Sequence, residues 1–546
     1  MNHKWWKEQV VYQIYPRSFF DANGDGIGDL KGIITKLDYL NLLGIDTLWI
    51  SPHFDSPNND NGYDIRNYKK VMEEFGTMED FDSLLEECHK RSIRLVIDLV
   101  VNHTSDEHNW FTESRSSKNN SYRDFYIWKK GKGINPPNNW TSFFGGSAWE
   151  KTNETDEYYL HYFSKKQPDL NWENYKVRES VYELMTFWLN KGIDGFRMDV
   201  IPFISKDERF LDMSKEELKT PEKFYAKGPK LDIYLKEMNR KVLSKYDIFS
   251  VGEAFGISSE TMMRISDERE QELDLVLLFD IIRIGRDDWY QDTWTLPQLK
   301  KLFKIQSNTD KHHWPTVFLN NHDNPRSVSK YGNEKKYRVK SAKLLAILTL
   351  TQRGTPFLYQ GEEIGMTNFQ FEDIHEFDDL QVKGGLQKVL KNKIAKEEYL
   401  NHLNLSSRDH SRTLMQWKNE PHGGFSKNEN TWFFVNPNYS EINVEDSLKD
   451  PESVLNFYRN IILMRKKSKD LIYADYKDLD PDHPKIFCYK RLGVKQTYLV
   501  ILNFSSDYVK YEIPFFNSKY HLVISNNSDK ILHIKSNFIE LKPWDA

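Results

Sequence analysis

Eight short apolar runs recur along this chain, and amphipathic segments separate them. Each run is rich in aliphatic and aromatic side chains, and most end at or near a polar or charged residue, a pattern typical of buried parallel strands. The runs are Val10–Tyr15, Thr47–Ser51, Arg94–Val101, Gly195–Val200, Ile248–Ala254, Leu273–Phe279, Thr316–Asn321 and Pro356–Gln360. Eight strands that alternate with helices favour an α/β fold, a closed (β/α)8 TIM barrel, over an open doubly wound sheet.

Two segments break this rhythm. Residues 104–170 contain no clear helix and many Ser, Asn, Gly, Pro and aromatic residues, and they are too long for a structureless loop inside a compact domain. Beyond about residue 469, segments such as Ile486–Leu492 and Thr497–Phe504 alternate with a period of two, as antiparallel strands do. We therefore predict a catalytic barrel of residues 1–103 and 171–468, an inserted subdomain after strand 3 of residues 104–170, and a C-terminal antiparallel β-sandwich domain of residues 469–546.

Composition excludes several classes of protein. With 76 Lys and Arg against 81 Asp and Glu, the chain lacks the basic excess of a nucleic-acid-binding protein. No run approaches the ~18 apolar residues of a membrane helix, and the first residues do not resemble a secretion signal. Cys88 and Cys488 are far apart and are interpreted as buried or half-buried thiols in a reducing compartment. We expect a cytoplasmic monomer with no nucleic-acid or membrane partner.

Carboxylates lie within, at the end of or just after four predicted strands: Asp98, Asp199, Glu253 and Asp323. A charged carboxylate in an apolar strand is unfavourable unless it is paired or hydrogen-bonded. For any one of them a salt bridge at the barrel rim is an equal alternative, but four acids at four strand exits are harder to explain that way. Arg197 lies two residues before Asp199, so both side chains share one face of the strand. Carboxylates beside neutral imidazoles, here His103 and His322, are the groups that glycoside hydrolysis uses.

Four motifs stand in order at these strand ends: DLVVNH (Asp98–His103), GFRMDV (Gly195–Val200), GEAF (Gly252–Phe255) and NNHDNPR (Asn320–Arg326). Their order and spacing resemble the signature set of glycoside hydrolase family 13, the α-amylase and α-glucosidase clan. QPDLNWEN (Gln167–Asn174) is similar to an additional region of the oligo-1,6-glucosidase branch. The resemblance extends to RDHSRTLMQW (Arg408–Trp417) and covers most of the chain. Any single tetrapeptide is weak, but the ordered set is very specific.

The resemblance implies a retaining mechanism. Asp199 occupies the position of the nucleophile, which would form the covalent glucosyl enzyme. Glu253 would act as the general acid and then as the base that activates water. Asp323 would bind sugar hydroxyls and stabilise the distorted transition state. His103 and His322 would donate hydrogen bonds to the same sugar ring. Arg197 would position the nucleophile.

The family's pocket for one terminal glucose matches Asp60, Tyr63 and Arg412. Residue chemistry agrees, because an exo-acting enzyme must end its pocket with polar groups that satisfy the hydroxyls of the non-reducing end. A surface ion pair is the alternative interpretation of Asp60 and Arg412. Phe144 and Phe163, in the aromatic inserted segment, are candidate walls for the sugar, although packing in a core explains either ring at least as well.

Only a few residues indicate which glycosidic bond the enzyme prefers. Val200 follows the nucleophile position and would crowd the aglycone side, and in the resembled branch valine accompanies a preference for α-1,6 bonds. Phe255, Asn324 and the segment Phe279–Trp289 instead look like sucrose isomerases, and Leu414 departs from the branch's usual proline. We expect a glucosidase that hydrolyses short α-glucosides and prefers isomaltose and isomaltulose- or trehalulose-type disaccharides to maltose. Sucrose is a further candidate substrate. Isomerisation of sucrose through the same covalent enzyme is the alternative.

A possible metal loop precedes the second strand. Oxygen donors recur at positions 1, 3, 5 and 9 from Asp21 and glycine stands at position 6, as in the front half of a Ca²⁺ loop, but position 12 is Gly32 instead of glutamate. The resembled branch carries a structural Ca²⁺ in the same loop, far from catalysis. The expected ligands are the side chains of Asp21, Asn23, Asp25 and Asp29 and the carbonyl of Ile27. A turn without an ion is the alternative, and catalysis itself needs no metal.

Two rival classes remain. A non-catalytic sugar-binding homologue would be expected to lose the three acids, all of which this chain keeps. An endo-acting amylase would lack the groups that close the pocket, and Asp60 and Arg412 argue against it. The expected partner is therefore a small oligosaccharide or disaccharide substrate.

Overall fold

The computed structural model describes residues 4–287, 293–307, 311–391, 395–514, 516, 520–527, 533–534 and 537–546. None of the helices in these residues combines the length and hydropathy that a bilayer crossing requires. Cys88 and Cys488 are buried free thiols, as the sequence predicts.

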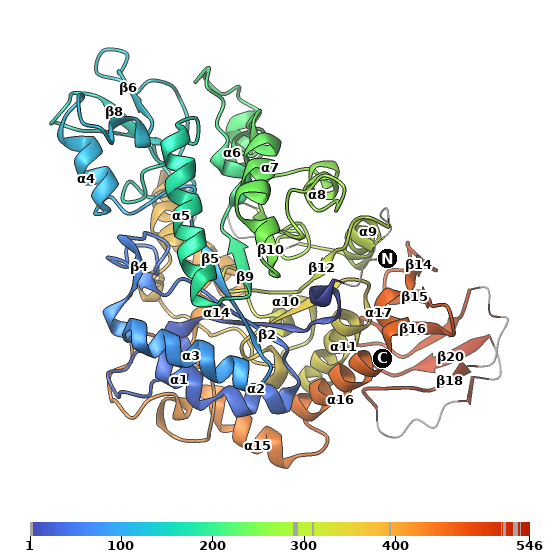
Figure 1. The fold of residues 1–546 in the computed structure, drawn as a ribbon. Helices are drawn as coiled ribbons and strands as arrows, with labels where there is room; N and C mark the ends of the chain where they lie inside the picture. The colour runs from blue at the N-terminus through green and yellow to red at the C-terminus, as the bar shows by residue number, and fades with distance from the viewer. Residues whose placement is uncertain are drawn as a thin grey trace.

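All eight predicted strands form one parallel sheet at the centre of the molecule (Figure 1). They are β1 (Val11–Ile14), β2 (Thr47–Ile50), β5 (Arg94–Leu99), β9 (Gly195–Met198), β10 (Phe249–Ala254), β11 (Leu275–Leu278), β12 (Thr316–Val317) and β13 (Thr355–Tyr359). Their hydrogen-bonded order is β11-β10-β9-β5-β2-β1-β13-β12. At the remaining junction the hydroxyl of Thr316 donates to the carbonyl oxygen of Val276 at 2.8 Å, which nearly closes the ring. The predicted barrel is confirmed, and the carboxyl ends of its strands lie at one rim.

Helices cover the outside of the barrel (Figure 1). α3 shows how the sequence forms them: Thr77 and Asp80 make a capping box, and Phe81, Leu84 and Leu85 lie buried along one face. The described helices between β1 and β13 outside the inserted segment are α1 (Leu30–Thr35), α2 (Leu37–Leu43), α3 (Met78–Lys90), α5 (Tyr175–Lys191), α6 (Pro221–Tyr225), α7 (Leu231–Lys241), α8 (Ser259–Ile265), α9 (Leu296–Ser307), α10 (Ser327–Tyr331) and α11 (Arg338–Thr351).

The segment of residues 104–170 leads from β5 to α5 and lies at one end of the molecule (Figure 1, upper left). It contains a small antiparallel sheet of β6 (Trp128–Lys129), β8 (Tyr158–Leu160) and β7 (Trp149–Lys151). The expectation that it holds no clear helix is wrong, because α4 spans Asn109–Ser116. The ring of His108 caps this helix by accepting the N–H of Trp110 at 3.1 Å, a local cap that apolar periodicity does not reveal.

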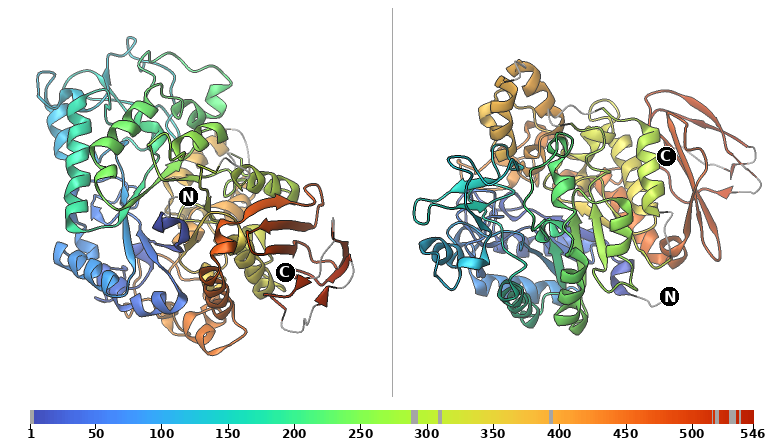
Figure 2. Two further views of the ribbon diagram at one scale, coloured as in Figure 1. Left: turned by 45° about the vertical axis from the view of Figure 1, so that its right-hand side comes forward. Right: turned by 90° about the horizontal axis from the view of Figure 1, so that it is seen from above.

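Antiparallel strands after residue 474 lie on the far side of the barrel from the inserted segment (Figure 2). They form three small sheets, of β14 (Asp475–Asp478), β15 (Ile486–Leu492) and β16 (Thr497–Asn503), of β17 (Val509–Glu512) and β20 (Phe538–Leu541), and of β18 (Tyr520–His521) and β19 (His533–Ile534). The predicted C-terminal β domain is thereby confirmed. The period-two pattern did not reveal β14, whose side chains are mostly polar.

A long connection after β13 returns to the barrel rim before the chain reaches the C-terminal strands. Its described helices are α12 (Leu380–Lys391), α13 (Lys396–Ser406), α14 (Asp409–Arg412), α15 (Val444–Lys449), α16 (Val454–Lys467) and α17 (Lys469–Tyr473). Gly384 of α12 packs so closely on the inserted segment that an added Cβ would lie 1.8 Å from the carbonyl oxygen of Phe144. This connection therefore forms part of the wall above the strand ends.

Candidate active site

A pocket opens at the carboxyl ends of the barrel strands. Eight residues that the sequence predicts for the site line it: Asp60, Tyr63, His103, Phe144, Phe163, Asp199, Glu253 and Asp323. Arg197, His322 and Arg412 do not line it but are buried among these residues. The structure thus brings together side chains from the segments that follow β2, β5, β9, β10 and β12, from the inserted segment and from the connection after β13.

One guanidinium organises three carboxylates. Arg197 is fully buried on β9, and its Nη1 donates to Asp98 Oδ1 at 2.7 Å and to Asp199 Oδ1 at 2.8 Å. Its Nη2 donates to Glu253 Oε2 at 2.5 Å, and the backbone N–H of Val200 donates to the same oxygen at 3.1 Å. The predicted contact between Arg197 and Asp199 is present, and the same cation also fixes the acid of the neighbouring strand.

Three negative charges around one positive charge leave this cluster with a strong tendency to hold a proton. Burial, followed by the charge of Glu253, raises the pKa of Asp199 well above its usual range despite the opposing charge of Arg197. Burial also raises the pKa of Asp98 to about 6, against the lowering effect of Arg197. The Asp199–Glu253 pair can therefore supply a proton and a carboxylate at the same place.

His322 is held as a neutral ring beside these acids. Its Nε2 lies 2.6 Å from the hydroxyl of Tyr63, its Nδ1 lies 2.7 Å from the amide nitrogen of Gln13, and the Tyr63 ring stacks on it at 5.4 Å. Burial lowers the pKa of His322 to about 3, so the ring remains uncharged at neutral pH. Nε2 also lies 3.2 Å from Asp323 Oδ2, so His322 supports this pocket-lining carboxylate from behind.

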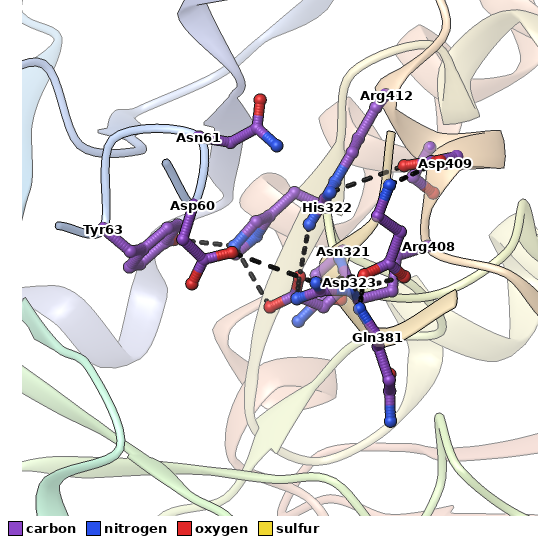
Figure 3. A network of polar contacts seen from close by, with 12 residues as sticks. Asp60, Asn61, Tyr63, Asn321, His322, Asp323, Gln381, Arg408, Asp409 and Arg412 are labelled. Atoms are coloured by element: carbon purple, nitrogen blue, oxygen red, sulfur yellow. Dashed lines mark hydrogen bonds and ion pairs between the residues drawn. The ribbon is translucent and has the colours of Figure 1, made fainter. Parts of the chain in front are cut away.

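Asp323 is the carboxylate that the site keeps ionised. Burial alone would raise its pKa, but the charges of His322, Arg408 and Arg412 oppose burial and hold that pKa well below the usual range. Because His322 is neutral near pH 7, the two guanidiniums carry this effect. Arg408 Nη1 and Arg412 Nη2 donate to the same oxygen, Asp323 Oδ1, at 3.1 and 3.2 Å (Figure 3).

Asp60 lies beside a guanidinium that the sequence prediction did not include. Asp60 Oδ2 accepts a hydrogen bond from the side-chain amide of Gln167 at 3.0 Å, and Asp60 Oδ1 lies 4.0 Å from Arg408 Nη2. The guanidinium nearest Asp60 is therefore that of Arg408, whereas Arg412 contacts Asp323 and, at 3.4 Å, Asp409. Sequence reasoning missed Arg408, although it begins the quoted motif RDHSRTLMQW.

Arg408 is itself fixed from the connection after β13. Asp379 is fully buried and binds this guanidinium through both carboxylate oxygens, with Arg408 Nε donating to Oδ2 at 2.9 Å. The bidentate pair has the planar geometry that favours arginine over lysine. No pattern in the sequence singled out Asp379, because a pair of charged residues in polar segments leaves no periodicity.

Aromatic rings form the other walls. Phe144 and Phe163 lie 5.8 Å apart between ring centres, and Phe143, Phe255 and Phe279 line the same pocket. The guanidinium of Arg283 lies 4.7 Å from the ring centre of Phe255, and both residues line the pocket. Of the isomerase-like segment Phe279–Trp289, the positions Asp288 and Trp289 lie outside the described residues.

Val200 has an unusual backbone conformation for a β-branched residue. Its φ of 34° and ψ of 41° fall in the left-handed region, which such residues rarely adopt. This turn directs the N–H of Val200 to Glu253 and leaves its side chain in the pocket wall. Val200 therefore lines the pocket in a strained backbone conformation, and its crowding of the aglycone side stays a prediction.

The predicted calcium loop is well ordered by backbone contacts. The carboxylate of Asp21 accepts the N–H groups of Gly24 and Gly26 at 2.6 and 2.8 Å, and that of Asp25 accepts the N–H of Ile27 at 2.8 Å. Asp29 likewise accepts backbone N–H groups, while Asn23 and Asp25 are exposed. Within the described ranges, no three His, Cys, Asp or Glu side chains gather closely enough to hold a metal ion. The oxygen donor set suits Ca²⁺, and its binding here stays a prediction.

Comparison with known sequences shows the family to which the chain belongs. Residues 13–474 match the family described as "Alpha amylase, catalytic domain". An oligo-1,6-glucosidase of Bacillus cereus is 48% identical over 555 residues, which cover 100% of this chain and 99% of that protein. A glucan 1,6-alpha-glucosidase of Streptococcus dysgalactiae subsp. equisimilis is 43% identical, with 100% and 99% covered.

Solved structures give an equally close match. A mutant isomaltulose synthase of Erwinia rhapontici NX5, in complex with its natural substrate sucrose, has a TM-score of 0.98 at 48% identity and covers 100% of this chain and 98% of its own. The isomaltulose synthase of Protaminobacter rubrum gives the same TM-score and identity, with 100% and 99% covered. Identity alone therefore does not separate a hydrolase of α-1,6-glucosides from an enzyme that rearranges sucrose.

Proposed function

The chain belongs to the alpha amylase catalytic-domain family, glycoside hydrolase family 13, and from this premise we propose that it is a retaining, exo-acting α-glucosidase. Its substrates are short α-glucosides, with isomaltose and isomaltulose- or trehalulose-type disaccharides first. The observation that carries the proposal is the contact of Asp199 and Glu253 with the one guanidinium of Arg197.

This contact supports retention over inversion. Retaining glycosidases hold their two carboxyl groups ~5–5.5 Å apart, whereas inverting enzymes leave ~6.5–9.5 Å for a water molecule. Two carboxylates that share one planar guanidinium fit the shorter spacing. Asp199 attacks the anomeric carbon while Glu253 gives its proton to the glycosidic oxygen, and the aglycone leaves. Glu253 then takes a proton from water, which displaces Asp199 and releases glucose.

The closed end of the pocket supports exo action. Asp60, Asp323 and Arg408 present two acceptors and a donor at the position of the terminal sugar, and His322 adds a neutral ring. These groups have the donors and acceptors that the hydroxyls of one non-reducing glucose require. The aromatic side of the pocket, with Phe255 and Arg283, is then the place of the aglycone.

Isomerisation of sucrose is the second candidate function. It is favoured by Arg283 over the ring of Phe255, where a released fructose would be held, and by the similarity to isomaltulose synthases. Hydrolysis remains the proposal because Val200 narrows the aglycone side and the curated relatives with the same full-length coverage are 1,6-glucosidases.

Product analysis tests the choice. The protein is incubated separately with sucrose, isomaltose, isomaltulose, trehalulose and maltose, and the products are resolved by chromatography. Glucose from isomaltose, and glucose plus fructose from isomaltulose and trehalulose, are expected. Accumulation of isomaltulose or trehalulose from sucrose would replace the proposal by the second candidate.

Two further properties belong to the proposal. A small saccharide is the partner of the site, and the enzyme acts as a monomer. The two buried free thiols fit a reducing, cytoplasmic location.

A further inference from the structure

Behind the pocket wall, a buried lysine touches two residues that the proposed chemistry does not use. The side chain of Lys206 is 5% exposed and follows β9 in the chain. Its ammonium donates to Asn102 Oδ1 at 2.6 Å and lies 3.1 Å from Asp169 Oδ2. Asn102 and Asp169 are fully buried, so Lys206 joins the exit of β5 to the inserted segment.

This contact fixes the orientation of an amide. An ammonium group only donates hydrogen bonds, so the carbonyl oxygen of Asn102 must face Lys206. The NH₂ group of Asn102 then faces the neighbouring ring of His103, whose Nδ1 lies 3.2 Å away. A donor at that distance requires a lone pair on Nδ1, and a neutral ring with a lone pair on Nδ1 carries its proton on Nε2.

The other contacts of His103 do not by themselves determine which ring nitrogen carries the proton. Nε2 lies 3.2 Å from the carbonyl oxygen of Tyr63, which needs a donor, and 3.2 Å from the amide nitrogen of Gln167, which needs an acceptor. The same amide nitrogen of Gln167 also donates to Asp60, which fixes the orientation of the Gln167 side chain. With Asn102 oriented as observed, a proton on Nε2 satisfies two of the three neighbours and a proton on Nδ1 satisfies one. If the amide turned over, the count would reverse.

We propose that Lys206 is a positioning residue that sets the tautomer of His103 through the side chain of Asn102, so that the ring presents an Nε2–H donor to the bound sugar. His103 lines the pocket, so the Nε2–H can reach a hydroxyl of the terminal glucose. The kinetic part of this inference rests on the proposed function, whereas the tautomer does not. Burial, with the charge of Lys206 as the next cause, lowers the pKa of His103 to about 3 and keeps the ring neutral.

Removing the ammonium should release the amide. In Lys206→Met the apolar stem remains, but no donor holds the carbonyl oxygen of Asn102 in its present place, so the amide is free to turn over. The carbonyl oxygen of Asn102 would then face His103 Nδ1, and the proton would move to Nδ1. Lys206→Arg keeps a cationic donor at the site and should keep the proton on Nε2 if its larger head is accommodated.

Nitrogen-15 NMR of the free protein measures this directly. Histidine is labelled selectively, the ring signals of His103 are assigned by their loss in His103→Gln, and the two nitrogens are distinguished by their pyrrole-type or pyridine-type shifts. The wild type should show one tautomer with protonated Nε2, and Lys206→Met should show protonated Nδ1. A wild-type ring protonated on Nδ1, or an unchanged tautomer in folded Lys206→Met, would overturn the inference.

A second variant covers the case in which Lys206→Met does not fold. Asn102→Asp has the same shape, keeps Lys206 in contact with Asp169, and presents only oxygen to Nδ1. It should move the proton to Nδ1, and a ring that stays protonated on Nε2 alone would refute the relay through Asn102.

Kinetics separate this inference from the proposed function. Loss of one donor to the sugar should raise KM for isomaltose about ten-fold in Lys206→Met while kcat changes less. The ring nitrogens report the tautomer whether or not the protein cleaves α-glucosides. A predicted tautomer shift in a protein without glucosidase activity would refute only the proposed function.

Discussion

At the scale of single residues, Arg197 determines the charge state of the proposed catalytic pair. It is buried among Asp98, Asp199 and Glu253, so one positive charge faces three carboxyl groups that cannot all be ionised in a dry site. The cluster relieves this imbalance by holding a proton. A retaining mechanism needs that proton on the acid and the negative charge on the nucleophile when substrate is bound.

Glu253→Gln tests the electrostatic part of this description. Without the charge of Glu253, the pKa of Asp199 should fall, because that charge is the largest cause after burial that raises it. A step that needs ionised Asp199 becomes faster as pH rises through this pKa, so in the variant its acid limb should move to lower pH. Release of fluoride from α-glucosyl fluoride in the first turnover provides the pH profile, since fluoride leaves without a proton donor.

The control for this experiment is Glu363→Gln, which changes another buried glutamate outside the pocket. It should leave the acid limb in place. An acid limb that stays fixed or moves to higher pH in Glu253→Gln would contradict the assigned interaction.

Arg408 is the second residue whose removal has a defined consequence. Arg408→Met leaves Asp379 fully buried without its cation, and the free energy of unfolding should fall by about 3–5 kcal/mol. KM for isomaltose should rise more than kcat falls, because Asp60 and Asp323 lose a guanidinium that helps to orient them. The stability and the KM of Arg408→Lys should lie between those of the wild type and Arg408→Met, because lysine keeps the charge without the bidentate geometry.

Urea unfolding and steady-state kinetics give both quantities, and Arg240→Met serves as the control at an exposed position in α7. Equal stability of the Arg408→Met and Arg240→Met proteins would show that the pair with Asp379 has no structural role.

The candidate residues on strands were predictable because parallel strands bring their carboxyl ends to one rim. Asp98, Asp199 and Glu253 come from neighbouring strands, and their meeting follows from the order β5-β9-β10. Arg408 and Lys206 were not predictable in this way. Both act through contacts between irregular segments, and nothing in the local pattern indicates which carboxylate or amide each one meets.

At the scale of elements, the apolar runs predicted strands well and the polar segments poorly. Every run became a barrel strand because a strand buried on both faces is apolar throughout. Helix α4 and strand β14 were missed, since one depends on a histidine cap and the other pairs through its backbone with mostly polar side chains. Hydrogen bonds stabilise both elements, and neither has the hydrophobic periodicity from which it could have been predicted.

The loop from Asp21 to Asp29 carries a prediction at this scale. If Ca²⁺ binds the folded loop, a free calcium concentration of about a hundred times Kd should raise the free energy of unfolding by about 2.7 kcal/mol. Removing the calcium with a chelator should therefore lower Tm. Catalysis should be unaffected below Tm. Differential scanning calorimetry with calcium and with a chelator measures the effect.

Asp25→Ala provides the matched comparison, because it removes an exposed candidate ligand and should abolish the response to calcium. A wild-type Tm that is the same in calcium and in chelator would leave the loop as a turn without an ion.

At the scale of the whole molecule, two buried arginines bind carbonyl groups at the end of α11, and one of them, Arg491, comes from the C-terminal strands. Arg465 of α16 donates to the carbonyl oxygens of Leu350 and Gln352 at 2.8 and 3.1 Å, at the end of α11. Arg491 of β15 donates to the carbonyl of Thr351 and, at 2.7 Å, to that of Ala474. Both cations therefore satisfy carbonyls at the negative end of a helix.

Arg491→Met should destabilise the protein without changing its chemistry. Several charge-assisted hydrogen bonds are lost and buried carbonyls are left unpaired, so the free energy of unfolding should fall by about 2–4 kcal/mol. The pocket lies at the barrel rim, and none of the described residues that line it belongs to the C-terminal strands, so kcat/KM at 25 °C should match the wild type. A change in kcat/KM without a change in stability would mean that these strands influence the pocket.

The central claim is that Asp199 forms a covalent bond to glucose. The protein is inactivated with 5-fluoro-α-glucosyl fluoride, digested, and its peptides are analysed by mass spectrometry. One fluoroglucosyl group on the peptide that contains Asp199, and its absence from the Asp199→Asn protein, is the predicted result. A label on Asp98, Glu253 or Asp323 instead, or no label while β-glucose is the first product of hydrolysis, would contradict it.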